Sequence, residues 1–73
     1  MEDYVLIAAL ETVTEARLVE AVLIERDIPH TLQPYEVEAL DGSWGHIDAP
    51  KTYQKVIMFI LSDLRKDASR HKG

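Results

Sequence analysis

The clearest hydrophobic pattern of the chain lies in its C-terminal third. The apolar residues there recur at i, i+3, i+4, i+7, i+8 and i+11, the spacing that places side chains on one face of an α-helix. They are Tyr53, Val56, Ile57, Ile60, Leu61 and Leu64. The pattern predicts one amphipathic helix with Pro50 in its first turn, Asp48 as its cap and an end near Lys66.

Two large apolar residues of this segment, Met58 and Phe59, fall outside the stripe. They give a surface helix more apolar area than a small core needs. One interpretation packs them beneath the long connection between Pro34 and Ser43. The other makes them a docking patch for a helix or groove of another protein.

The N-terminal half predicts a strand followed by a helix. The run Tyr4–Leu10 is continuously apolar, as expected of a strand covered on both faces. Thr12 and Glu15 have the spacing of a capping box, in which the Glu15 carboxylate reaches back to the start of the helix. We expect Glu15 to lie on the side of the helix that faces solvent. The helix should end near Arg26, and its predicted core positions are Val13, Ala16, Val19, Val22 and Leu23.

Asp27 stands where a left-handed residue would end the helix. Two strands follow, Ile28–Gln33 and Trp44–Ala49, the first with Pro29 at its start. The element order is therefore strand, helix, strand, strand, helix. We predict an α+β fold, a split β-α-β plait of the ferredoxin-like or GlnB-like kind, with sheet order 1-3-2 and both helices on one face.

Composition narrows the class of protein. Seventy-three residues make one domain, which we place at 1–67, followed by a frayed basic tail at 68–73. The chain has no cysteine and a net charge of −5, so a disulfide framework is excluded and an acidic body disfavours nucleic acid. No apolar run is long enough for a membrane span, and the acidic N-terminus is unlike an export signal, so a cytoplasmic location is expected.

The candidate chemistry lies on the third predicted strand. Trp44, His46 and Asp48 alternate and so share one face, which we expect to be the open face of the sheet beside apolar residues of the first strand. An apolar open face favours a face-to-face homodimer. His46 and Asp48, with His30 across the hairpin, are the one arrangement that resembles a metal or acid–base site.

The residues also resemble a known family over roughly Tyr4 to Leu64. The shared features are the apolar first strand, Thr14-Glu15-Ala16 opening the helix, Leu23 to Ile28 leading into the second strand, Trp44-Gly45-His46-Ile47, and the helix after Pro50. The chain resembles a small bacterial family of signal-transducing proteins, a domain of unknown function with a ferredoxin-like or GlnB-like plait. That resemblance implies a binding or signalling module and no catalytic residue, and Asp27 replaces the glycine expected there.

We therefore expect a non-enzymatic regulatory module for signal transduction and protein binding, with no cofactor. The expected partners are a second copy of the chain and another protein. Its candidate interaction surface comprises Trp44, His46, Asp48, Glu36, Glu38, Asp41, Met58 and Phe59. The alternative is a small-ligand or metal-binding sensor that uses Trp44, His46 and Asp48.

Overall fold

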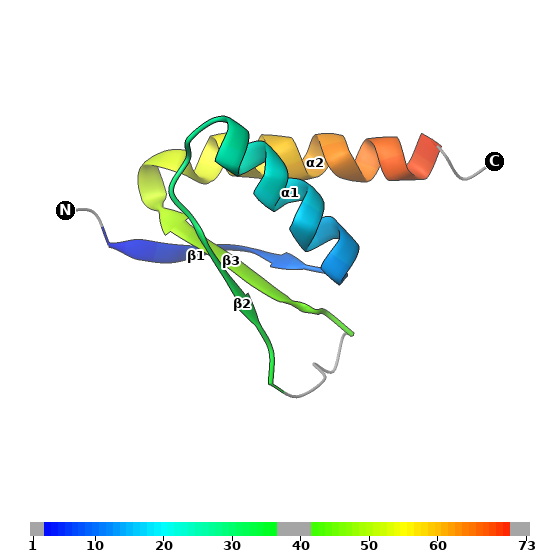
Figure 1. The fold of residues 1–73 in the computed structure, drawn as a ribbon, viewed down its shortest axis with the longest axis horizontal. Helices are drawn as coiled ribbons and strands as arrows, with labels where there is room; N and C mark the ends of the chain where they lie inside the picture. The colour runs from blue at the N-terminus through cyan, green and yellow to red at the C-terminus, as the bar shows by residue number, and fades with distance from the viewer. Residues whose placement is uncertain (1–2, 37–41, 71–73) are drawn as a thin grey trace.

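The computed structural model of the chain describes residues 3–36 and 42–70. It contains three strands, two α-helices and one short 3₁₀ turn (Figure 1). In chain order they are β1 (Tyr4–Leu10), α1 (Val13–Glu25), β2 (Thr31–Pro34), β3 (Gly45–Pro50), the 3₁₀ turn Lys51–Tyr53 and α2 (Gln54–Arg70).

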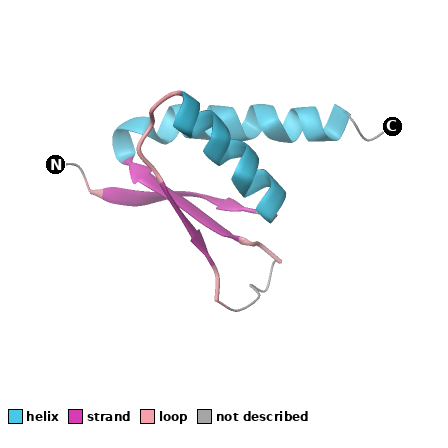
Figure 2. Ribbon diagram, in the orientation of Figure 1, coloured by secondary structure: helices cyan, strands magenta, loops and turns pink. Residues whose placement is uncertain are grey.

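The sheet has the predicted order, with β3 between β1 and β2. β3 pairs antiparallel with both neighbours, so β1 and β2 run in the same direction. Both helices lie on one side of the sheet and leave its other side open (Figure 2). The α+β class and the three-stranded order 1-3-2 are confirmed.

Capping interactions fix both ends of α1. The Thr12 side chain accepts a hydrogen bond of 3.0 Å from the Glu15 amide, as the capping box predicts. The Glu15 carboxylate reaches back one residue further than a standard box and accepts from the Glu11 amide at 3.0 Å.

At the other end of α1, Asp27 adopts φ 58°, the predicted left-handed position. The Asp27 amide donates to the Ile24 carbonyl and the Ile28 amide donates to the Leu23 carbonyl, which together form a Schellman motif. Leu23 and Ile28 are also both buried in the core cluster, and apolar residues at these two positions usually accompany the motif. Because the Ile28 amide closes the helix, β2 begins at Thr31, three residues later than predicted.

The start of α2 differs from the prediction. Pro50 is the last residue of β3, and Asp48 pairs within that strand, so neither residue begins the helix. A 3₁₀ turn over Lys51–Tyr53 connects the strand to α2 instead. The helix then continues to Arg70, beyond its predicted end near Lys66, and so includes the first residues of the segment predicted to fray.

β1 contains an irregularity that the sequence pattern does not indicate. Its register with β3 shifts between Leu6 and Ala8, so Ile7 is an extra residue, as in a β-bulge. Ile7 is buried and Ala8 packs against the core, whereas Leu6 is 58% exposed. The prediction that both faces of this strand are covered is therefore wrong, and neither simple alternation of its residues describes the open face.

The core lies between the sheet and the helices. From α2 it takes Ile57, Ile60 and Leu61. Val56 and Leu64 of α2 and Tyr53 of the 3₁₀ turn pack at its margin, which confirms the predicted stripe. The remaining buried apolar residues are Ile7, Leu10, Ala16, Val19, Leu23, Ile28, Ile47 and Ala49. Of the predicted α1 stripe only Val13 is exposed, at 45%.

Candidate functional site

The open face of the sheet carries the residues that the sequence singled out on β3. Opposite residues of antiparallel strands point to the same side. Asp48 lies opposite Leu6 on β1 and Thr31 on β2, while His46 lies opposite Ala9 and Gln33. Ile47 and Ala49 point the other way, into the core. Because β3 is central, His46 and Asp48 sit in the middle of the open face.

His46 and Asp48 form a close pair there. His46 Nε2 lies 3.3 Å from Asp48 Oδ1, with side-chain exposures of 22% and 24%. This contact is not a hydrogen bond, because Asp48 Oδ1 is buried without a hydrogen-bond partner. His46 Nδ1, the other nitrogen of the ring, is also buried and has no partner. The Tyr35 ring lies beside His46, with the two ring centroids 5.6 Å apart and the rings tilted by 50°. The arrangement is a partly buried polar pair beside an aromatic ring.

The other residues proposed for a metal or ligand site are placed differently. His30 Nδ1 lies 2.9 Å from the carbonyl of Ile28, next to the end of α1. Within residues 3–36 and 42–70, no group of three potential ligands from His, Cys, Asp and Glu could hold a metal ion. The three-residue site of His30, His46 and Asp48 is therefore not formed there.

Trp44 packs against the core cluster rather than lying freely on the open face. It also lines a hollow of about 340 Å³ with Glu36 and the residues that begin α1. Two further residues of the predicted contact surface, Glu38 and Asp41, lie outside the described residues.

Met58 and Phe59 are exposed on α2, at 47% and 71%. The interpretation that packs them beneath the connection between Pro34 and Ser43 is therefore wrong. They lie on the helix side of the sheet, opposite the face of His46 and Asp48. The described candidate residues thus form no single site: one pair lies on the open face, another on α2, and Trp44 and Glu36 line the hollow beside the start of α1.

A further contact, which the sequence pattern did not indicate, joins the two helices and β1. Arg65 of α2 donates from its Nε to one oxygen of Glu15 and from Nη2 to the other, each at 2.9 Å. Nη2 also donates to the backbone carbonyl of Ala9 on β1 at 3.1 Å and lies 4.0 Å from Glu11. One guanidinium thereby joins α2 to α1 and β1.

The electrostatics of Glu15 follow from this contact. Hydrogen bonding by Arg65 holds the pKa of Glu15 below its ordinary value and outweighs partial burial, which acts in the opposite direction. The Glu11 amide adds to the lowering. Glu15 is the better buried partner, since its side chain is 12% exposed and that of Arg65 is 41% exposed. Glu15 therefore does not point to solvent as the sequence suggested.

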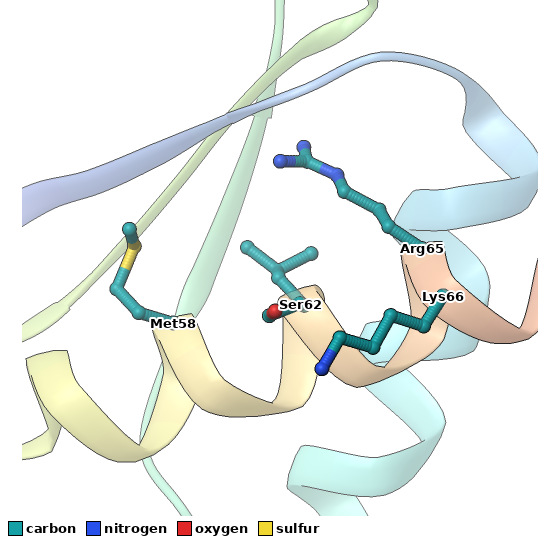
Figure 3. Close-up of a pocket in the computed structure, with 5 residues that line it drawn as sticks. Met58, Ser62, Arg65 and Lys66 are labelled. Atoms are coloured by element: carbon teal, nitrogen blue, oxygen red, sulfur yellow. The ribbon is translucent and has the colours of Figure 1, made fainter.

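A shallow groove lies along α2 beside this contact. It is lined by Met58, Leu61, Ser62, Arg65 and Lys66 and has a volume of about 380 Å³. Figure 3 shows Met58 and Arg65 projecting from α2 toward β1. The groove therefore borders the outer edge of the sheet.

No helix in the part of the chain that the structure describes combines the length and apolarity needed to cross a membrane.

Comparison with protein-family models, with curated proteins and with solved structures finds no match to this chain.

Proposed function

We propose that the protein is a non-enzymatic regulatory module that works by binding other protein chains and forms a homodimer through the open face of its sheet. The observation that carries this proposal is the exposure of large apolar side chains on and beside that face. Tyr4 is 47%, Leu6 58% and Tyr35 39% exposed, around the half-buried pair of His46 and Asp48. Grouped apolar exposure of this kind is typical of interaction surfaces.

The polar pair in the middle of the face favours a specific interface over non-specific hydrophobic association. The buried Nδ1 of His46 and Oδ1 of Asp48 have no hydrogen-bond partner, and such atoms cost free energy until they are paired. A second copy placed face to face would meet the part of this pair that stays exposed, 22% of the His46 side chain and 24% of the Asp48 side chain. Three strands about 4.8 Å apart make a narrow face, so the dimer should be weak.

The test is sedimentation of two matched variants. Leu6→Lys places a charge on the open face and should weaken dimerisation by about tenfold, the cost of removing one apolar contact from an interface. Phe59→Lys makes the same kind of change on α2, away from that face, and should leave the dimer unchanged. Equal behaviour of the two variants would show that the open face is not the interface.

A ligand sensor is the second candidate, and the close pair of His46 and Asp48 is the observation that favours it. Saturable amide shifts confined to β3 on titration with metabolites would support the sensor. Trp44 weakens this candidate because it packs against the core cluster.

The finer classification is also a proposal. The strand order and the two helices on one side support a ferredoxin-like or GlnB-like plait, and the residues from Tyr4 to Leu64 support the small bacterial signal-transducing family. A cytoplasmic location accords with the absence of cysteine. Imaging of a tagged full-length chain in bacteria would test the location.

A further inference from the structure

β1 is an edge strand whose outer side has no partner in the part of the chain described here, since the sheet order is β1-β3-β2. Edge strands in natural proteins usually carry a charge or a proline that prevents further pairing. Between Tyr4 and Leu10 there is neither. The bulge at Ile7 is the one such device built into the strand.

The direction of the backbone groups shows which part of the edge is available. The Leu10 carbonyl accepts from the Trp44 amide and so points toward β3. Because carbonyls alternate along a strand, the Ala9 carbonyl points outward, where Arg65 donates to it at 3.1 Å. Arg65 therefore covers the Ala9 end of the edge, and the end from Tyr4 to Leu6 remains exposed.

The groove on α2 defines the chemistry of a strand added at this edge. Such a strand would lie about 4.8 Å outside β1 and run beneath the flank of α2 that carries the groove. Met58 offers it an apolar surface, and Lys66 places positive charge beside the Ala9 end, where Arg65 is already paired with Glu15. The matching strand has apolar side chains facing α2 and acidic residues at that end.

A second copy of β1 fits this position poorly. α2 packs against β1, so pairing two β1 strands would bring the two copies of α2 over strands about 4.8 Å apart. Packed helices need 8–10 Å between their axes. An extended peptide has no helix to place and avoids this conflict.

We propose that the free edge of β1, beneath the Met58–Lys66 flank of α2, binds an extended peptide strand of another protein, with acidic residues of that peptide beside Lys66. The inference rests on the proposed role as a protein-binding module and names the class of partner. It uses a surface separate from the open face.

The experiment is an amide-resolved NMR titration with four synthetic peptides. Each has an alternating Val-Thr core and carries either two Asp or two Lys residues at one end, the N-terminal or the C-terminal end. We expect an Asp peptide to give saturable shifts over β1 and Met58–Lys66, and its Lys counterpart to bind at least fivefold more weakly. The same Asp peptide with alternate amides N-methylated should not bind, because it cannot pair with the edge.

Two charge-reversal variants complete the test. Lys66→Glu should weaken binding of the Asp peptide by about fivefold, the effect of one exposed ion pair. Arg17→Glu, on the exposed side of α1, should leave the affinity for this peptide unchanged. Equal binding of Asp and Lys peptides, shifts elsewhere on the molecule, or no saturable shift at millimolar concentration would overturn the inference. If the chain dimerises but binds none of the peptides, only the peptide site is contradicted. If it is a monomer that binds the Asp peptide, only the dimer is contradicted.

Discussion

Because Gly45 has no Cβ atom, β2 and β3 can approach closely at this position. A Cβ built on Gly45 would clash with the Gln33 carbonyl oxygen and lie 2.7 Å from the Pro34 Cα, both of them backbone atoms that cannot move aside. We predict that Gly45→Ala lowers the free energy of unfolding by about 3 kcal/mol.

Denaturant unfolding of the variant checks this value. The matched control is Gly42→Ala, since a Cβ on Gly42 meets nothing within 4 Å and the cost there comes only from φ +79°. That strain should amount to about 1 kcal/mol. Equal losses for the two variants would contradict the steric account of Gly45.

Asp27 is the second residue at which backbone conformation determines how a substitution changes the stability of the fold. At φ 58° an L-amino acid is strained, and Asp tolerates the position better than most but less well than Gly. We predict that Asp27→Gly stabilises the fold by about 0.5 kcal/mol and that Asp27→Val destabilises it by more than 1 kcal/mol. Thermal unfolding of the two variants measures both effects, and an unchanged or lower stability for Asp27→Gly would contradict the prediction.

At the scale of elements, the contact of Glu15 with Arg65 links α1, α2 and β1. The two residues are 50 positions apart and share a two-pronged ion pair that also satisfies the Ala9 carbonyl. We predict a coupling free energy of about 1 kcal/mol in a double-mutant cycle of Glu15→Gln and Arg65→Met. Additive effects of the two substitutions would show that the pair contributes nothing beyond its separate residues.

The same pair predicts a pH dependence. Because the pKa of Glu15 is lowered in the folded state, its contribution is fully present above the ordinary Glu pKa of about 4.3 and is lost as pH falls through the folded-state value. The stability difference between the natural chain and Glu15→Gln should therefore be constant near neutral pH and shrink below about pH 4. A difference that grows on acidification would contradict this sign.

At the scale of the whole molecule, the order of elements was enough to predict the topology. A strand, helix and strand in succession require a right-handed crossover, and the short return to β3 places that strand between the other two. The stripe on α2 likewise predicted which of its residues are buried. These features depend on local periodicity and on general rules of chain connection.

Other features depend on contacts that local pattern does not encode. The bulge at Ile7 has no sequence signal, because every residue from Tyr4 to Leu10 is apolar. In the sequence pattern, Arg65 is one of several basic residues at a helix end. Its partner Glu15 is a capping residue that was expected to face solvent. The grouping of His30 with His46 failed because the Schellman motif delays β2 and leaves His30 outside the strand.

We propose above all that the chain binds a second copy through its open sheet face. The most direct test is a filtered NOE experiment on a mixed sample of isotope-labelled and unlabelled chains at high concentration. Cross-peaks between the side chains of Leu6 or Tyr35 in one copy and the open face of the other are the predicted result. Intermolecular cross-peaks confined to α2, or none at all from a chain that remains an 8.3 kDa monomer, would contradict a dimer through the open face.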